Sequence, residues 1–179
     1  DPDSLQAIPK DIDAAYYLLH SMSTSVDFTR VEAICAEHFK SRIEQTNAKQ
    51  VVYLSGIVNQ VQLSEHLNSR KQVEDILRSN RYALTTLRAG IIVGSGSASF
   101  EIIRDLVEKL PVMIAPKWLQ TRTQPIGISD VLNYLLGVLG LEITFNQHYD
   151  IGSKDILTYK EMLLGFAKVR GLKRRIWTV

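Results

Sequence analysis

Three polar side chains in the middle of the sequence have the types and the spacing of a ligand-binding or proton-transferring site. Ser55 follows an apolar, β-rich run at residues 51–54, and Gly56 behind it indicates a turn. His66 and Arg70 come next, four residues apart, on a segment of helical periodicity. An imidazole can move a proton near neutral pH, and a guanidinium can fork onto a diol. Because ligands bind at the carboxyl ends of parallel strands, we expect the hydroxyl and the helix to meet there.

Each of these residues also has a purely structural interpretation. A serine after a strand is frequently just a turn residue. On an exposed helix His66 and Arg70 would be solvated, and Arg70 with Glu74 would form an i,i+4 ion pair worth roughly 0.2–0.5 kcal/mol. The residues alone leave both interpretations open.

Segments of strand and helix character alternate along the chain. Strands are predicted at residues 13–19, 51–54, 82–88, 111–115, 149–152 and 174–179. Amphipathic helices are predicted at residues 27–46 and 66–80, around residues 100–110, up to residue 139, and from a capping box at Thr158 to Gly171. This alternation predicts an α/β fold of three layers, a mostly parallel sheet flanked by helices, in one domain over residues 1–179.

Cys35 is the single cysteine, which excludes internal disulfides and fits a reducing, cytoplasmic location. It belongs to an apolar stripe on the helix predicted at residues 27–46. We expect this stripe to be buried and the thiol to be inert. Its members are Val31, Ile34, Cys35, Phe39 and Ile43.

Composition and charge narrow the range of partners. The formal net charge of the 179 residues is +2, too mild to indicate nucleic acid or an anionic membrane. The longest apolar run, residues 131–143, is interrupted and too short to span a bilayer. The four histidines lack the spacing of a metal site, so no metal is expected. We therefore expect neither nucleic acid nor a membrane as a partner.

Two further motifs have competing interpretations. The glycine-rich turn at residues 94–97 precedes a helix and could hold a phosphate on its backbone amides, but a plain turn is favoured. The basic run at residues 168–175 lies at the end of the last predicted helix. Cations are stabilised near a helix C-terminus, so a structural role is favoured there.

Four motifs occur in a fixed order: DIDAAYYLLHS, VVYLSG with HLNSR, LRAGIIVGSGS, and QPIGISDV followed by YDIGSKDILTYKEM. Together they closely resemble the extended and atypical short-chain dehydrogenases/reductases. These are NAD(P)-binding Rossmann proteins that include NAD-dependent epimerases/dehydratases and the NmrA-like group. The resemblance implies a Rossmann-like, doubly wound sheet and NAD or NADP as cofactor.

The resemblance assigns catalytic roles to Ser55, His66 and Arg70. The family's serine falls on Ser55, and its Tyr-x-x-x-Lys pair falls on His66 and Arg70. In the family the tyrosine exchanges a proton, and the lysine holds the nicotinamide ribose. This chain departs from the pattern at both positions. Arginine keeps a fixed cation, and histidine can still carry a proton, although a neighbouring Arg70 disfavours its charged form.

The same resemblance implies a set of cofactor-binding residues at the ends of two predicted strands and on the helix predicted at residues 66–80. Leu19, His20 and Ser21 would face the phosphates and the nicotinamide. Arg70 would hold the ribose. Ala89, Gly90 and Ile91 would form the wall beside the nicotinamide.

One family feature has no counterpart in these residues. The first βαβ unit, with the glycine-rich turn that seats the pyrophosphate, would precede Asp1. We therefore expect a sheet that is incomplete at the N-terminus, a chain that is a fragment of a longer one, and weak NAD(P) binding by the fragment alone. The choice between NAD and NADP stays open, because the residue that reads the ribose 2′ position would also lie upstream.

The resemblance supports two functions. One is an NAD(P)-dependent oxidoreductase or epimerase acting on a carbonyl or hydroxyl carbon of an unknown small molecule. The alternative is a non-catalytic NAD(P)-binding redox sensor or assembly module of the NmrA-like type. Retention of the Ser55, His66 and Arg70 set favours the first, and loss of the tyrosine favours the second.

Overall fold

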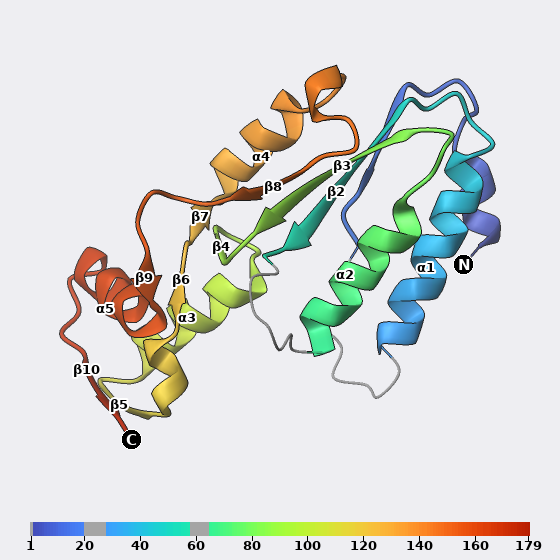
Figure 1. Ribbon diagram of the computed structural model, residues 1–179. Helices are drawn as coiled ribbons and strands as arrows, with labels where there is room; N and C mark the ends of the chain where they lie inside the picture. The colour runs from blue at the N-terminus through green and yellow to red at the C-terminus, as the bar shows by residue number, and fades with distance from the viewer. Residues whose placement is uncertain (1, 20–27, 58–64) are drawn as a thin grey trace. The chain divides into compact units, whose positions relative to one another are not determined.

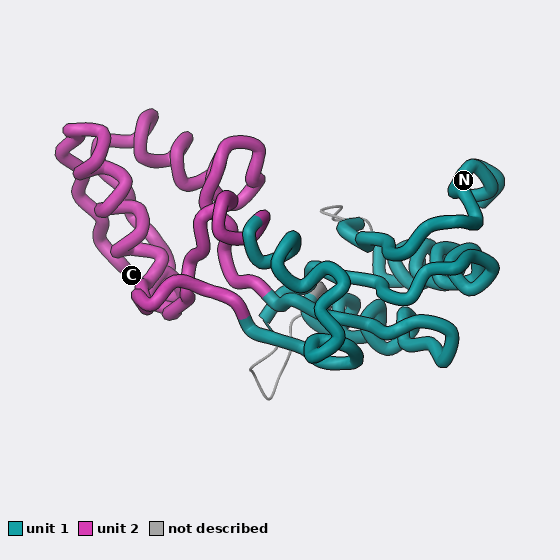
Figure 2. The backbone as a smooth tube through the Cα atoms, turned by 90° about the horizontal axis from the view of Figure 1, so that it is seen from above, with its two compact units in different colours: residues 1–88, 133–150 teal, residues 89–132, 151–179 magenta. Residues whose placement is uncertain are grey.

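The computed structural model describes residues 2–19, 28–57 and 65–179, with side chains in the last range from residue 67 onwards. The chain forms two compact units (Figure 2). Unit 1 comprises Asp1–Arg88 and Asn133–Asp150, and unit 2 comprises Ala89–Leu132 and Ile151–Val179. The prediction of a single domain stays a prediction, and each unit is described by itself.

Unit 1 is organised around a sheet of four strands in the order β1-β2-β3-β8 (Figure 1). The strands are β1 (Ala14–Tyr17), β2 (Gln50–Gly56), β3 (Ala83–Ala89) and β8 (His148–Ile151). β1 and β2 run parallel, with Ala14 opposite Gln50 and Tyr17 opposite Tyr53. The predicted α/β, Rossmann-like architecture with a parallel sheet is confirmed.

Helices cover both faces of this sheet (Figure 1). On one face lie α1 (Phe28–Ile43) and α2 (Glu65–Leu77), and on the other lies the second half of α4 (Ile128–Gly137). Neighbouring residues of a strand point to opposite faces, and β1 shows this directly. The Tyr17 ring packs edge-on against Phe39 of α1, at 4.9 Å between centroids, while the Tyr16 hydroxyl donates to the Leu135 carbonyl of α4 at 2.9 Å.

The buried face of α1 differs from the predicted stripe. Phe28, Glu32, Ala36, Phe39 and Ile43 are buried, whereas the predicted Val31, Ile34 and Cys35 are exposed. The helix is rotated so that small and aromatic residues face the core, and Glu32 is buried with them. The prediction of a buried, inert Cys35 was therefore wrong.

Strand β1 is shorter than predicted. It ends at Tyr17, and Leu18 and Leu19 beyond it are 48% and 62% exposed. The apolar run of residues 13–19 is therefore longer than the part of the strand that pairs with β2.

Within the described part of the chain, no helix has both the length and the apolar character needed to cross a bilayer.

A buried polar network joins the two stretches of chain that make up unit 1. Gln50, at the start of β2, donates from Nε2 to Thr85 Oγ1 at 2.8 Å and to the Val138 carbonyl at 2.9 Å. Its Oε1 accepts from the Gly140 amide at 2.7 Å. Thr85 in turn donates to the Thr144 carbonyl at 2.9 Å. The Gln50 side-chain amide and Thr85 thus hold the turn after α4 and the short helix η3 (Glu142–Thr144) against the sheet through hydrogen bonds.

Unit 2 consists of short strand pairs and two packed helices around a second apolar core. The pairs are β4 (Ile92–Val93) with β7 (Ile126–Gly127), β5 (Val112–Ala115) with β10 (Arg175–Thr178), and β6 (Arg122–Thr123) with β9 (Leu157–Thr158). The helices α3 (Ala98–Lys109) and α5 (Tyr159–Val169) pack together, and η2 (Lys117–Gln120) is a short 3-10 turn. Another 3-10 turn, η1 (Asp3–Ala7), opens unit 1.

The helix ends of unit 2 explain the capping motif and the basic run. Thr158 and Glu161 form the predicted capping box at the start of α5, and Gly171 ends that helix at φ +67°. Arg174, from the basic run, donates to the carbonyls of Val107 and Glu108 at 2.5 and 3.3 Å. These carbonyls belong to the last turn of α3, so the structural interpretation of the run is favoured, although Arg174 caps α3 rather than α5.

Candidate active site

Ser55 is a buried hydroxyl at the carboxyl end of β2. Its side chain faces the same side of the strand as Tyr53, and the residue is 2% exposed. Among the described residues its Oγ completes no hydrogen bond of normal geometry. A buried polar atom without a partner costs about 1–3 kcal/mol, so such an atom in a native fold calls for an explanation, and a ligand group is one candidate.

Arg70 reaches the same strand end from α2. A Cβ placed on Gly56 would lie 3.2 Å from Arg70 Cδ and 3.4 Å from its Nη1, so the guanidinium stem lies directly on the Gly56 backbone. The phenol of Tyr53 donates to the Arg70 carbonyl at 3.3 Å. The structure therefore brings Ser55 and Arg70 together at the end of β2, while their chemical roles stay predictions.

The Tyr53 phenol reports the electrostatics of this place. Burial raises its pKa, and the nearby Ser55 hydroxyl and the positive charge of Arg70 partly oppose that rise. The Ser55 hydroxyl thus lies near enough to the phenol to affect its pKa. The net direction is upward, so Tyr53 stays a neutral donor at physiological pH.

The remaining predicted residues of unit 1 are less informative. His66 is the second residue of α2, one helical turn before Arg70, and its side chain lies outside the described residues, as do His20 and Ser21. Leu19 lies two residues beyond β1 with its side chain exposed. Its contact with a cofactor stays a prediction.

Glu74 has different partners from the one predicted. It forms a forked ion pair with Arg88 of β3, with Oε1 and Oε2 both 3.0 Å from Arg88 Nη2 and Oε2 3.2 Å from Arg88 Nε. Arg78 adds a contact of 3.5 Å to Oε1. The expected Arg70–Glu74 pairing is replaced because Glu74 is buried between Val73 and Leu77 and faces β3. A carboxylate between two core residues was the sequence signal for such a partner.

The predicted nicotinamide wall belongs to unit 2. Gly90 lies so close to the chain at Gln124 that an added Cβ would be 2.7 Å from the Gln124 carbonyl oxygen. The Ile91 carbonyl accepts from the Ile126 amide at 2.9 Å, and Ala89 and Ile91 are buried. Only glycine fits at position 90, and a role of these three residues in cofactor binding stays a prediction.

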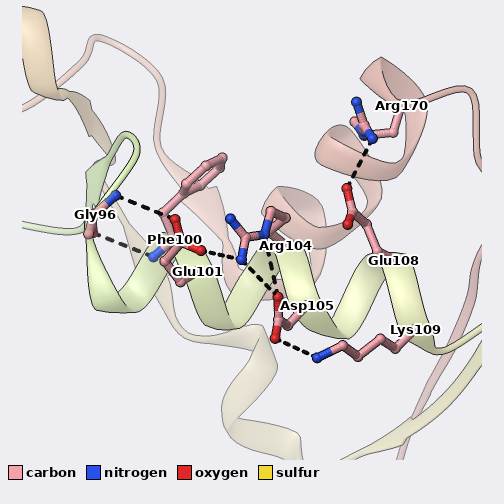
Figure 3. Close-up of polar contacts among 9 residues, drawn as sticks. Gly96, Phe100, Glu101, Arg104, Asp105, Glu108, Lys109 and Arg170 are labelled. Atoms are coloured by element: carbon pink, nitrogen blue, oxygen red, sulfur yellow. Dashed lines mark hydrogen bonds and ion pairs between the residues drawn. The ribbon is translucent and has the colours of Figure 1, made fainter.

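The glycine-rich turn before α3 is satisfied by the chain itself (Figure 3). Gly96 has φ +84°, and its amide donates to Glu101 Oε1 at 3.4 Å. Ser97 is the N-cap, and its Oγ accepts from the Phe100 amide at 3.5 Å. A carboxylate of the helix therefore takes the position in which a phosphate would bind, which favours the plain turn.

Charged side chains continue along α3 as a ladder of ion pairs (Figure 3). Arg104 contacts Glu101 and lies 3.1 Å from Asp105, and Lys109 lies 2.6 Å from Asp105. Glu108 pairs with Arg170 after α5 at 3.1 Å. These pairs are exposed and structural, and across the described residues no cluster of three metal-ligating side chains occurs.

No protein-family model and no curated protein matches the sequence. Solved structures do match it. UDP-N-acetylglucosamine 4-epimerase from Bacillus cereus is 16% identical with a TM-score of 0.75, over 99% of this chain and 71% of that one. RMD from Pseudomonas aeruginosa, solved with NADPH, is 14% identical with a TM-score of 0.81, over 99% and 74%.

A third match is TunA, an NAD-dependent NDP-hexosamine 5,6-dehydratase. It is 13% identical with a TM-score of 0.72, over 99% of this chain and 65% of that one. The chain has the Rossmann-like fold of these enzymes. The resemblance predicted from the four motifs is confirmed at the level of the fold.

Proposed function

We propose that this protein is an NAD(P)-dependent oxidoreductase or epimerase that acts on a carbonyl or hydroxyl carbon of a small molecule. The observation that carries the proposal is the convergence of Ser55 and Arg70 on the carboxyl end of β2. In a parallel α/β sheet this is the edge at which ligands bind. The fold shared with enzymes whose structures contain NAD or NADPH supports the same proposal.

The residues present fit the nicotinamide ribose end of such a cofactor. Arg70 carries a planar fork of donors that suits a diol, and its stem is held against Gly56. The buried Ser55 Oγ has hydrogen-bonding capacity left over among the described residues. When bound, the nicotinamide would supply or accept a hydride.

Each of the three site residues would then have one role. Ser55 would hydrogen-bond the oxygen on the reacting carbon and orient it. His66, one turn before Arg70, would exchange the proton of that oxygen, since imidazole titrates near neutral pH. Arg70 would hold the ribose hydroxyls. In an epimerase the same groups would take up the proton in one direction and return it in the other.

The departure at position 66 favours a second candidate function. Histidine stands where the family that the sequence resembles has tyrosine, and a protein that binds the dinucleotide without turnover needs no proton-exchanging group at that position. The alternative is therefore a non-catalytic NAD(P)-binding sensor or assembly module.

Binding and turnover, measured separately, distinguish the two functions. NADH and NADPH are titrated by fluorescence against the full-length protein, and its turnover is screened with aldehydes, ketones and nucleotide sugars. We expect His66→Phe to abolish turnover with binding retained, and Arg70→Met to weaken binding. Tight binding without turnover on any substrate class would support the sensor. Failure of the full-length wild-type protein to bind either dinucleotide would contradict both functions.

A further inference from the structure

The Glu74–Arg88 pair is the most buried ion pair among the described residues. The Glu74 side chain is 4% exposed and that of Arg88 is 17% exposed. Three contacts of 3.0–3.2 Å join the carboxylate to the guanidinium. A fork of this kind restricts both the distance and the orientation of its partners, because two parallel hydrogen bonds must stay in plane.

The pair lies one helical turn from the candidate site. Glu74 follows Arg70 by four residues on α2, and Arg88 is the residue before the end of β3. The fork therefore ties α2 to β3 just beyond the turn that carries Arg70.

Two more polar contacts hold the same stretch of α2. The Ser69 hydroxyl, 1% exposed, donates to the buried carboxylate of Glu32 on α1, and Tyr53 of β2 donates to the Arg70 carbonyl. Residues 69–74 are thus held by side chains from α1, β2 and β3, one from each.

Stability alone does not explain the fork. Well-packed apolar residues of similar volume hold a helix to a core as well as a buried ion pair does, and frequently better. The forked ion pair also fixes the orientation of α2, because it opposes both rotation of the helix and sliding along its axis. This orientation matters for Arg70, whose side chain lies so close to the Gly56 backbone that a Cβ added to Gly56 would be 3.2 Å from Arg70 Cδ.

We propose that Glu74 and Arg88 are positioning residues, whose forked pair sets the rotation and axial position of α2 and so holds Arg70 at the carboxyl end of β2. The consequence for cofactor binding rests on the function proposed above. Neither residue touches the reacting groups, and both act through the helix.

The test replaces the pair while keeping the fold. Glu74→Met combined with Arg88→Met exchanges the ion pair for apolar side chains, and Asp75→Asn, on the same turn but exposed, is the matched control. Three measurements are made on each protein: the melting temperature, the ¹⁵N NMR signals of the Gly56 amide and the Arg70 Nε–H, and the Kd for NADPH. Arg88→Lys, which keeps the charge without the fork, replaces the double variant if the latter does not fold.

We expect the double variant to melt near the wild-type temperature, with the Gly56 and Arg70 signals shifted or broadened. We expect its Kd for NADPH to rise by on the order of 10-fold. The control should leave all of these unchanged. Wild-type Gly56 and Arg70 signals in the double variant would overturn the inference. The NMR signals decide this even if the wild-type protein binds neither dinucleotide, an outcome that would count against the proposed function alone.

Discussion

At the scale of single residues, exposure and close approach decide what each side chain can do. Cys35 lies on α1 but points away from the core, and Gly56 carries no side chain because Leu67 and Arg70 occupy the space beside it. The exposure of the Cys35 thiol and the lack of space beside Gly56 can each be tested directly.

Cys35 should react as an accessible thiol. Because it is exposed, we expect one equivalent of thiol to react with Ellman's reagent in the native protein, and none in Cys35→Ser. The absorbance of the released thiolate measures this. A reaction that requires denaturant would show that the thiol is buried.

Gly56→Ala should disturb the candidate site. The new Cβ would lie 3.2 Å from both Arg70 Cδ and Leu67 Cδ2, so these side chains must move, at an expected cost of about 1 kcal/mol in unfolding free energy. Binding of NADPH should weaken as Arg70 shifts.

Gly165→Ala is the matched control for this substitution. Gly165 lies inside α5 with no atom within 4 Å of an added Cβ, so alanine should stabilise the helix by roughly 0.5–1 kcal/mol. Urea denaturation measures both variants. Equal effects at the two positions would contradict the close contact at Gly56.

At the scale of elements, helix ends show how short sequence signals become structure. The Glu161 carboxylate accepts from the Thr158 amide at 2.7 Å and from the Thr158 hydroxyl at 2.9 Å. These hydrogen bonds hold the pKa of Glu161 below its ordinary value, the backbone amide contributing most. A lowered folded-state pKa means that the ionised carboxylate stabilises the fold, and that this stabilisation is lost on acidification.

Glu161→Gln should therefore lower stability in a pH-dependent way. The stabilisation is fully present above the unfolded-state pKa of about 4.3, and it disappears as the pH falls through the lower folded-state pKa. We expect the melting temperatures of wild type and variant to differ at pH 7 and to converge as the pH falls through the lowered folded-state pKa of Glu161. Thermal denaturation by circular dichroism measures the gap. A gap that does not change with pH would show that the charge of Glu161 contributes nothing.

At the scale of the whole molecule, the chain leaves unit 1 at Arg88 and returns to it at Asn133. The returning stretch adds β8 as the edge strand next to β3, and the second half of α4 covers one face of the sheet. Gln50, 1% exposed, joins the two stretches through two hydrogen bonds, one to the Val138 carbonyl and one from the Gly140 amide.

Gln50→Met should be strongly destabilising although the two side chains are similar in size. It would leave the buried Thr85 hydroxyl and Val138 carbonyl with fewer partners, at a cost of about 2–3 kcal/mol. Urea denaturation measures the change, and Gln72→Met on the exposed face of α2 should stay within about 0.5 kcal/mol of wild type. A loss at position 50 no larger than at position 72 would show that the network is dispensable.

The sequence by itself determined the order of most elements, the capping box at Thr158, the left-handed turn at Gly171 and the position of Ser55 at a strand end. These features depend on periodicity and on the conformational preferences of neighbouring residues, which a sequence displays directly. The structure confirmed the parallel α/β architecture for the same reason.

Only the tertiary structure decided which face of α1 is buried, which partner Glu74 takes and how closely Arg70 lies on Gly56. Val31, Ile34 and Cys35 share helical spacing with the buried residues of α1, so periodicity alone could not exclude them. Glu74 and Arg88 meet across two elements, and their pairing depends on how α2 packs against β3. Contacts between residues distant along the chain follow from packing, which local sequence patterns do not encode.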